Sequence, residues 1–597
     1  MTAPRRSALV TAPLAGAALL LAFAFACSSR RGEFGPSDTP SFADAGDAQP
    51  DACAGLRCSR DLKKVLAACS DEVVETCGPD QGCGDGRCVD ACTSAMLSKG
   101  SSGCEFWTMP PTDEVEHGRG SCFAAMIANT WDRDITITAE LGSGPLDVSR
   151  SIYIARNGGP DTTYERLTGP LPPGEVGIVF LSQTPSLPDT QFYAPCPTGV
   201  EPAFEGEPIQ HGTARTRAFR LIADAPVTAY SIFPYGGAST FVPTATLLLP
   251  ASAWSTNYVA ITTAHADPGA PRLLQIVARE DGTDVWIDPK ADILDGIDLP
   301  GTALGVPTKW TLARGQALQI AQHADLAGSA IESTKPIGVF GGAQCAFLPA
   351  GIGACDITQQ QLPPVEQWGS EYVLAPYRPR IGDVTAGARE EVAYSLVGAV
   401  DGTTLTWDPS RPPGAPETLA AGQVASFMTS SLAVVKSQDA AHPFHAAVYM
   451  TGALFYGRQG IPTIGDPEFV NLVPSEQFLD RYVFFADYTY PETNLTIVRR
   501  RTQAGFQDVE LACAAGPVTG FLPVGTSGEY EIAWVQTTKE SRPQTVGTGE
   551  CGYGRHEARS NGPFSVSVWG MGFTASYGYA GGMGSRPVND VKVPVVR

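Results

Sequence analysis

The sequence predicts an all-β protein, built as a tandem repeat of four related β-sandwich-like units after a small disulfide-rich module. Glycine and proline account for 64 and 49 of the 597 residues, and only 17% of the residues are charged. This composition disfavours long charged helices and a coiled coil. Three short sequence elements recur in the same order, and cysteines crowd near the start of the chain. With 43% apolar residues, the chain can bury several cores of roughly 150 residues each.

The first recurring element is a proline followed by apolar residues. It reads ADAPVTAY at Ala223, STKPIGVF at Ser333, AAHPFHAAVY at Ala440 and SNGPFSVSVW at Ser560. We expect a strand that starts at the proline, which cannot donate a hydrogen bond to the ladder. The second element is a glycine turn that leads into a strand, at Gly174, Gly315, Gly422 and Gly528. It lies upstream of the proline element in each unit.

The third element opens the last three units with an aromatic residue and, four residues later, a tyrosine. It reads LPASAWSTNYV at Leu249, PPVEQWGSEYV at Pro363 and VPSEQFLDRYV at Val473. Three elements that recur in one order at similar steps predict an internal repeat. The predicted units cover residues 105–245, 246–345, 346–465 and 466–597.

Within a unit, apolar runs broken at an Asp-Gly pair predict hairpins. The two clearest are RLLQIVAREDGTDVWID (Arg272 to Asp288) and EVAYSLVGAVDGTTLTWD (Glu391 to Asp408). About six or seven short strands per hundred residues favour a β-sandwich in each unit. A β-propeller-like arrangement, with the repeats as paired blades, is the alternative. The pairs Gly236-Gly237 and Gly341-Gly342 are expected to be turn positions.

The start of the chain has the form of an export signal. Arg5 and Arg6 precede 19 uncharged residues, ALVTAPLAGAALLLAFAFA, and Cys27 follows. This pattern resembles a bacterial lipoprotein signal, in which the cysteine is acylated and becomes the new N-terminus. An ordinary secretory signal and an uncleaved anchor are the alternatives, because such a stretch could just span a bilayer. We predict a signal peptide over residues 1–26, lipidation at Cys27 and a flexible tether over residues 27–52.

The cysteines independently support export. Setting Cys27 aside leaves 14 of the 15 cysteines, an even number, as a set of disulfides requires. Eight of them lie in residues 53–104, where no CxxC spacing and no histidine supports zinc, so we predict a disulfide-held module there. Within it, Ser59 is expected to cap a short helix. For the remaining six we predict three pairs, each within or beside one unit: Cys122 with Cys196, Cys345 with Cys355, and Cys513 with Cys551.

The middle of the chain resembles a known family. The resemblance is carried by GSAIESTKPIGVFGGAQCAFLPAGIGACDITQQQLPPVEQWGSEYVLAP (Gly328 to Pro376) and AFRLIADAPVTAYSIFPYGG (Ala218 to Gly237). These stretches resemble the IgGFc-binding protein N-terminal domain family, named for a mucin-associated animal protein and found in many exported bacterial proteins. The resemblance implies an extracellular, non-enzymatic interaction module, here in a bacterial lipoprotein. It does not imply antibody binding, because no residues for that activity can be carried over.

No sequence pattern indicates catalysis or cofactor binding. The chain lacks a GxSxG elbow, an HExxH pair, a P-loop and a dinucleotide-type glycine fingerprint after a strand. We therefore predict no catalytic residues, no cofactor and no metal site. His442 and His445 are three residues apart near a predicted strand, which places them on opposite faces.

Two further groups have both a structural and a functional interpretation. Six aspartates from Asp281 to Asp298 could collect calcium, but they lack the alternating loop pattern, so we expect solvated turn residues. Trp254, Trp368 and Phe478 recur at one position of each unit. This recurrence predicts packing in a core rather than a platform that stacks on carbohydrate.

Charge and composition narrow the function. The formal net charge is −21 with no basic block, which argues against a nucleic-acid partner. We predict an exported, lipid-anchored binding or adhesion protein of the bacterial cell envelope, facing the periplasm or the cell exterior. Its expected partners are an extracellular protein or glycan, and the membrane through the lipid anchor. A structural envelope or matrix protein without a discrete ligand is the alternative, and a polysaccharide-acting enzyme with paired carboxylates is the third hypothesis.

Overall fold

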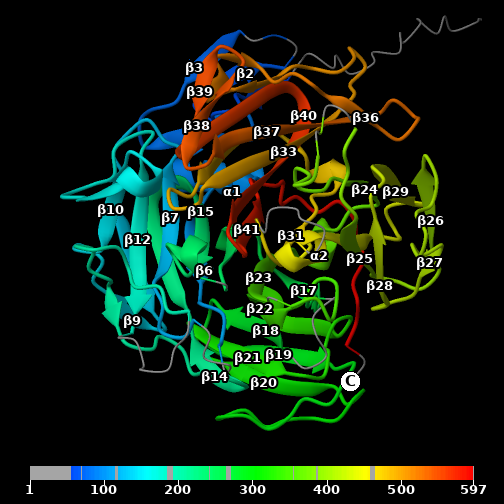
Figure 1. The fold of residues 1–597 in the computed structure, drawn as a ribbon. Coiled ribbons are helices and arrows are strands. Elements are labelled where there is room, and N and C mark those ends of the chain that lie inside the picture. Colours follow the sequence, from blue (N-terminus) through cyan, green and yellow to red (C-terminus); the bar gives the residue numbers. More distant parts are fainter. Residues whose placement is uncertain are drawn as a thin grey trace, which may run out of the picture. The chain divides into compact units, whose positions relative to one another are not determined.

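The computed structural model describes residues 55–595 apart from 69, 71, 114–117, 185–191, 241, 264–270, 354, 383, 385–386 and 458–463. Strands dominate this part of the chain, which confirms the all-β prediction (Figure 1). Residues 53–597 form one compact unit. The predicted signal peptide and tether lie outside the described residues. In the part that is described, no helix has the length and apolar character needed to cross a membrane.

The N-terminal module is built from short strands and one helix. They are β1 (Leu56–Cys58), β2 (Lys64–Ala67), β3 (Val73–Thr76), β4 (Gln81–Gly84), β5 (Arg87–Asp90) and α1 (Ala91–Ser98). The helix predicted after Ser59 is wrong. The Ser59 Oγ accepts a hydrogen bond from the Lys64 amide at 2.9 Å, which closes a turn. The chain then enters β2, whose backbone pairs with β1 on one side and β3 on the other.

Four stretches of chain follow the module. The first contains β6 (Gly103–Thr108), β7 (Phe123–Asn129), β8 (Ile137–Leu141), β9 (Gly144–Leu146), β10 (Ile152–Arg156), η1 (Gly159–Asp161), β11 (Thr163–Arg166), β12 (Val176–Gln183), β13 (Phe204–Glu205), β15 (Phe219–Phe233), η2 (Gly237–Ser239) and β16 (Thr244–Leu248). The second contains η3 (Ala251–Ala253), β17 (Ser255–Val259), β18 (Arg272–Ala278), β19 (Thr283–Asp288), β20 (Thr308–Leu312), β21 (Gln316–Gln322), β22 (Ala330–Ala346) and β23 (Asp356–Leu362), with β14 (Ala214–Arg217) added to its sheet.

The third stretch contains η4 (Val365–Gln367), β24 (Glu371–Leu374), β25 (Val392–Gly398), β26 (Thr403–Asp408), β27 (Thr418–Leu419), β28 (Val424–Thr429), β29 (Ala433–Ser437), β30 (Phe444–Met450), α2 (Ala453–Gly457) and β31 (Glu468–Asn471). The fourth contains η5 (Ser475–Gln477), β32 (Leu479–Ala486), β33 (Glu492–Arg500), β34 (Val509–Leu511), η6 (Ala512–Ala514), β35 (Gly516–Pro517), β36 (Leu522–Val524), β37 (Tyr530–Lys539), β38 (Arg542–Val546), β39 (Gly549–Cys551), β40 (Gly554–Gly572) and β41 (Ala575–Ala580).

One pattern of strand pairing recurs in the four stretches. In the second, the first half of the long strand β22 pairs with β17 and β19, and its second half pairs with β18 and β23. The long strands β15 and β40 pair in the equivalent way. The first half of β15 pairs with β6 and β8 and its second half with β7 and β16, while the first half of β40 pairs with β32 and β34 and its second half with β33 and β41. In the third stretch the long strand is split into β29 and β30, which leaves two separate four-stranded sheets. Apolar side chains from both of these sheets form one core.

The third recurring element has one structural role wherever it occurs. After a short 3-10 helix, the hydroxyls of Tyr258, Tyr372 and Tyr482 donate hydrogen bonds of 2.8, 2.7 and 2.6 Å to the carbonyls of Ile337, Phe444 and Phe564. Each acceptor is the residue after the proline of the first element. The two sequence elements therefore join the opening strand of a stretch to its long strand.

The first stretch also has this opening strand, although its sequence does not show the third element. Gly103 of β6 pairs with Val227 after Pro226, as Ser255 of β17 pairs with Ile337 after Pro336. Three residues beyond Gly103, Phe106 occupies the place that a tyrosine takes in the other stretches. Because the tyrosine that marks the element in the other stretches is replaced by phenylalanine here, the sequence pattern does not match.

The prolines of the first element do not start strands as predicted. Pro226, Pro336 and Pro563 lie inside long strands, and only Pro443 precedes its strand. In β22 the pairing with β19 ends at Ser333 and the pairing with β18 begins at Ile337. A residue without an N–H is tolerated there because the long strand changes neighbours and needs no ladder donor at that point.

Glycines serve two different purposes in this fold. Those of the second element, Gly174, Gly315, Gly422 and Gly528, have φ angles of 76°, 77°, 67° and 71°, so they are turn residues as predicted. The pair Gly341-Gly342 is not a turn but lies inside β22. A Cβ on Gly341 would lie 1.7 Å from the Ile261 carbonyl oxygen, and one on Gly342 would lie 1.8 Å from that of Thr358. These two glycines allow β23, and the segment that follows β17, to approach β22 closely.

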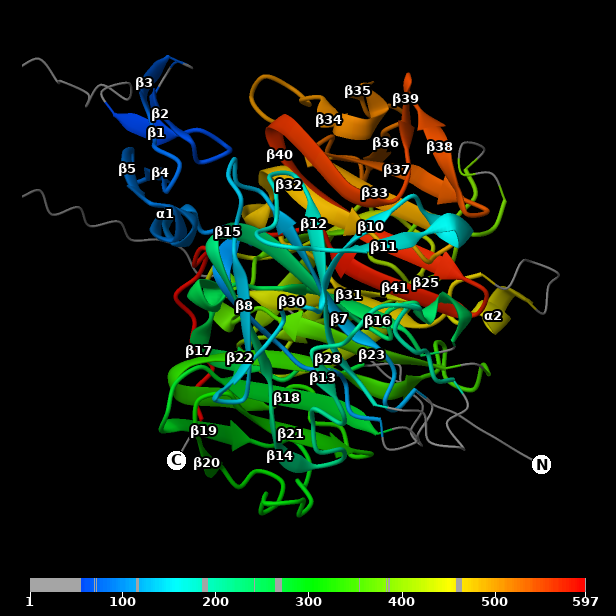
Figure 2. The ribbon, with the colours of Figure 1, turned by 90° about the vertical axis from the view of Figure 1, so that its left-hand side faces the viewer.

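The last strands of the four stretches, here called the closing strands, meet one another. They are β16, β23, β31 and β41, and β16 and β31 each contact both β23 and β41 (Figure 2). The Gln360 side chain donates to the carbonyls of Ala245 in β16 and Gly578 in β41, at 2.7 and 2.9 Å. Because β23 and β31 begin after residues 345 and 465, their pairing extends the second and third stretches beyond the predicted boundaries.

Candidate functional site

The cysteines predicted as site residues lie in three disulfides of the structure. Cys122 is bonded to Cys196, Cys345 to Cys355 and Cys513 to Cys551, the pairs expected from the sequence. In the module the structure has Cys58 bonded to Cys83, Cys77 to Cys88 and Cys92 to Cys104. Cys27, the predicted lipidation site, lies outside the described residues.

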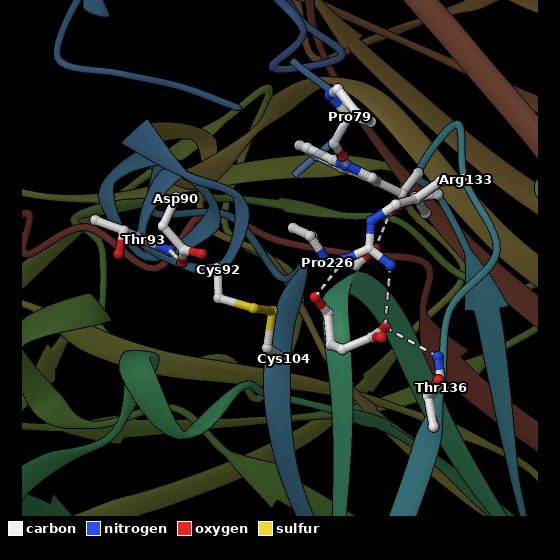
Figure 3. Close-up of a disulfide and its surroundings, with 11 residues drawn as sticks. Pro79, Asp90, Cys92, Thr93, Cys104, Arg133, Thr136 and Pro226 are labelled. Carbon is white, nitrogen blue, oxygen red and sulfur yellow. Dashed lines mark hydrogen bonds and ion pairs between the residues drawn. A yellow bond between two sulfur atoms is a disulfide. The ribbon is translucent and has the colours of Figure 1, made fainter. Parts of the chain in front are cut away.

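The module is fixed to the first stretch by a disulfide and by Arg133 (Figure 3). Cys92 of α1 is bonded to Cys104 of β6, and the Asp90 side chain caps α1 by accepting from the Thr93 amide at 3.0 Å. The Arg133 guanidinium lies 2.9 Å from the carboxylate of Asp80 in the module and donates to the Asp224 carbonyl of β15 at 2.9 Å. These contacts hold the module beside the strands.

A cleft of about 400 Å³ lies between the module and the first and fourth stretches. Its polar lining includes the hydroxyl residues Ser59, Ser98, Ser101, Ser102, Thr130 and Thr228 and the charged residues Arg57, Arg60, Asp61, Asp480 and Arg481. Arg60 donates to the Asp480 carboxylate at 2.7 Å and to the Asn561 side chain at 2.9 Å. Arg481 donates to Glu557 at 2.9 Å. The cleft therefore offers hydroxyls and paired charges to a small polar ligand.

A second surface, the apolar loop, is formed by residues 289–307 between β19 and β20. Four large aliphatic side chains on it face solvent: Leu294, Ile297, Leu304 and Val306 are 61%, 52%, 59% and 50% exposed. Exposed aliphatic side chains that gather in one short segment mark an interaction site more often than scattered ones do.

The apolar loop has a fixed shape. Ile293 and Leu299 are buried in the core of the second stretch and anchor it. The carboxylates of Asp292 and Asp295 each accept a backbone hydrogen bond of 2.7 Å from within the loop. The Ile297 amide also donates to the Thr213 carbonyl, and the Arg215 amide of β14 donates to the Ile297 carbonyl, both at 2.9 Å. A surface held in this way loses little conformational entropy when a partner binds.

Four of the six aspartates considered as calcium ligands accept hydrogen bonds from the protein; Asp281, Asp292 and Asp295 lie in loops or turns, as expected, whereas Asp284 lies in β19. Besides Asp292 and Asp295, Asp281 accepts from the Arg314 amide at 2.9 Å, and Asp284 accepts from the Thr311 hydroxyl at 2.5 Å. In the described part of the chain, no group of three or more histidines, cysteines or acidic residues is placed to hold a metal ion.

The paired histidines do not form a common site. His442 lies on a turn before β30, with its Nδ1 2.7 Å from the Asp439 carboxylate. His445 is buried in β30, with its Nε2 3.0 Å from the Asn471 side-chain oxygen. Burial lowers the pKa of His445 to about 4, so its imidazole is neutral at physiological pH.

The recurring aromatic residues are core residues, as predicted. Trp254, Trp368 and Phe478 are 6%, 1% and 9% exposed, and each follows a short 3-10 helix. They therefore cannot serve as a carbohydrate platform. The apolar loop was missed from the sequence, although ILDGIDLPGTALGVP (Ile293 to Pro307) mixes large aliphatic residues with turn formers and lacks the alternation of a strand.

Comparison with known proteins confirms the family resemblance. The family model described as IgGFc binding protein matches residues 244–570, more than half of the chain. Over 183 residues, 30% of this chain, the sequence is 27% identical to human IgGFc-binding protein. The matched stretch covers 3% of that protein's length. No solved structure matches the chain. The chain belongs to the IgGFc-binding protein family.

Proposed function

We propose that this chain is an exported binding protein that captures an extracellular protein through the apolar loop. The carrying observation is the exposure of four large aliphatic side chains on a loop held by buried anchors and backbone hydrogen bonds. Residues 289–307 also lie within the segment matched by the family model, whereas the module does not. Most of the binding energy of a protein interface comes from a few residues that lose all contact with water, and exposed aliphatic side chains that lie together can be buried in this way.

The surroundings of the apolar loop suggest the chemistry of the partner. Asp292, Asp295 and Asp298 are exposed between the aliphatic side chains. The whole chain carries a formal charge of −21. A partner with an apolar centre and basic side chains around it would be complementary in both respects and would be attracted at a distance.

The other predicted ligand class, a glycan, fits the polar cleft better than the apolar loop. Hydroxyl groups and paired charges line the cleft, and these groups can exchange hydrogen bonds with sugar hydroxyls. Aliphatic side chains on the loop offer no such bonds. If the protein binds glycans on an array, and variants of the apolar loop bind them equally well, this second candidate would be favoured.

Replacing Leu304 by aspartate is the first test of protein binding. The Fc part of immunoglobulin G is the probe, because the matched family is named for it, and Fab fragments are the control. We expect saturable binding of Fc by the full chain, weakened roughly tenfold or more by Leu304→Asp, since a central apolar contact is lost. Leu56→Asp is the matched control, because Leu56 is 52% exposed but lies in the module. Equal binding by both variants would place the site elsewhere, and a complete lack of Fc binding would mean that the family's named ligand is not shared.

We also propose that the protein is held in a bacterial envelope by a lipid on Cys27. Acylation contributes about 0.8 kcal/mol per buried methylene, so more than one chain gives stable anchoring. We expect a lipid mass on the N-terminal peptide of protein taken from membranes. The Cys27→Ser variant should instead be either soluble or still joined to its signal peptide. An unmodified N-terminal peptide in the membrane fraction would contradict the lipid anchor. The other two hypotheses are a structural matrix protein and a polysaccharide-acting enzyme. A matrix protein would show no partner binding that Leu304→Asp weakens, and an enzyme would turn over polysaccharide.

A further inference from the structure

The place where the closing strands meet contains three buried carboxyl groups. Asp356 is the first residue of β23, Glu468 is the first residue of β31, and Asp466 lies two residues before it. All three side chains are fully buried, with 0% exposure. Glu468 accepts from the amides of Ala245 at 3.3 Å and Phe469 at 2.9 Å.

Two of these carboxyl groups are poorly satisfied. Neither side-chain oxygen of Asp356 has a hydrogen bond of normal geometry, and the Oδ2 of Asp466 has none. The other oxygen of Asp466 accepts from the Ala453 amide at 3.0 Å. A buried carboxylate without partners would cost several kcal/mol, so charge must be supplied from nearby or removed by a proton.

The nearby cation, Arg380, is already paired with another buried carboxylate. Arg380 acts on Asp466, but its guanidinium lies 2.9 Å from Glu390 in a pair whose side chains are 4% and 1% exposed. It also donates to the carbonyls of Thr451 and Ile464 at 2.9 and 3.0 Å. In the described chain no group of three or more acidic or histidine side chains is placed to hold a metal ion. A proton is therefore the counter-charge that the geometry leaves.

The other ionisable groups near the cluster carry no positive charge. They are Tyr377 beside Arg380, and Tyr490, which interacts with Asp356 and Glu468 and also with Asp487 and Tyr577. Burial raises the pKa of Asp466 to about 7 and that of Asp487 to about 6. Burial, together with the charges of Asp466 and Glu468, raises the pKa of Asp356 well above its usual range, against the effect of the Ser576 amide.

We infer that Asp356, Asp466 and Glu468 form a proton-dependent lock, which holds the four closing strands together while the carboxyls are protonated and loosens them when the protons leave. Each closing strand belongs to a different stretch, so the lock acts on the packing of the stretches against one another. The inference is independent of the proposed ligand. It makes the compactness of the molecule a function of the acidity of its surroundings.

The direction of the effect follows from proton linkage. In the opened state the carboxyls are exposed and ionise near their ordinary pKa values. In the closed state their pKa values are higher, so at a pH between the two values the closed state binds more protons. Opening is therefore favoured as pH rises. Each carboxyl that loses its proton on opening raises the opening equilibrium about tenfold per pH unit, on the order of 100-fold between pH 5 and pH 7 for Asp466 alone.

Hydrogen exchange of the full chain, measured from pH 5 to pH 8 and corrected for the intrinsic rate, tests the lock. We expect protection in peptides covering β23 and β31 to fall as pH rises, while β18 and β25 change little. Asp356→Asn and Asp466→Asn, which imitate the protonated carboxyl, should flatten this dependence and exceed the wild type in protection at pH 8. Asp298→Asn, at an exposed turn, is the matched control and should behave as the wild type.

Two outcomes would overturn the lock. One is protection of β23 and β31 that does not change with pH in the wild type. The other is loss of protection in the asparagine variants at pH 5 and pH 8 alike, which an ordinary packing role would give. If a variant does not fold, the infrared spectrum of the wild type decides: the lock requires a protonated-carboxyl C=O band that persists at pH 6, and its absence would contradict the inference.

Discussion

Replacing Trp368 by alanine is expected to lower the free energy of unfolding by about 3 to 5 kcal/mol, because a large buried ring leaves a cavity that its neighbours fill only partly. Trp368 is 1% exposed, its Nε1 donates to the Pro363 carbonyl at 3.1 Å, and its ring lies 5.4 Å from that of His445. The backbone of Trp368 also accepts a hydrogen bond of 2.8 Å from Asn589. Urea unfolding of the full chain measures the change.

Trp254→Ala gives the paired measurement in the second stretch. Trp254 occupies the same place in the recurring element and is 6% exposed. It packs against Gly338, where an added Cβ would lie 2.5 Å from the ring. We expect a loss of similar size, and additive losses in the double variant if the two sites share no partners. Unchanged melting and protease resistance in both single variants would show that the rings are not core residues.

Replacing Arg380 by methionine is expected to cost about 3 to 5 kcal/mol, because it leaves the buried carboxylate of Glu390 without a cation. The same change removes the donors to the carbonyls of Thr451 and Ile464. Thermal unfolding at neutral pH measures the loss. The double variant Arg380→Met with Glu390→Gln should recover part of it, since no buried charge then remains unpaired.

Arg411→Met is the control for the buried pair. Arg411 lies 2.7 Å from Glu417, but the two side chains are 45% and 72% exposed. An exposed ion pair contributes about 1 kcal/mol or less, so this variant should unfold almost as the wild type does. A loss as large as that of Arg380→Met would show that burial is not the reason for the effect.

The parts of the fold that were predictable depend on local patterns. Turns at Gly315 and Gly422 could be predicted because a left-handed backbone selects glycine whatever the tertiary structure. The buried Trp368 could be predicted because a repeat places the same side chain at the same point of each core. The Asp-Gly pairs at Asp281 and Asp401 do form turns, but the hairpins predicted there are wrong. β22 lies between β18 and β19 in their sheet, and β25 and β26 belong to different sheets, so the strands that each turn connects do not pair.

The parts that were not predictable depend on contacts between distant residues. Pro336 lies inside β22 rather than at its start, because the strand changes neighbours there, and only the sheet topology reveals that change. Gly341 looked like a turn residue because its real constraint, the Ile261 carbonyl, is far away in sequence. The opening strand of the first stretch could not be predicted because Phe106 stands where the other three stretches have a tyrosine.

The candidate site divides in the same manner. The three disulfide pairs outside the module could be proposed from the unit to which each cysteine belongs. The apolar loop could not, because exposure of Leu294 or Leu304 depends on which side chains of the loop the core accepts, here Ile293 and Leu299. The buried carboxyls of Asp356 and Asp466 likewise become neighbours only when closing strands from different stretches meet.

The most direct test of protein binding through the apolar loop is photo-cross-linking on the cells that make the protein. A photoreactive amino acid takes the place of Leu304 in the full chain, and in a second variant it takes the place of Leu56, whose exposure is similar. We expect one discrete protein adduct at position 304, absent at position 56 and suppressed by excess soluble wild-type chain. The absence of any adduct at positions 294, 297, 304 and 306, with an adduct instead at a cleft position such as 102, would contradict it.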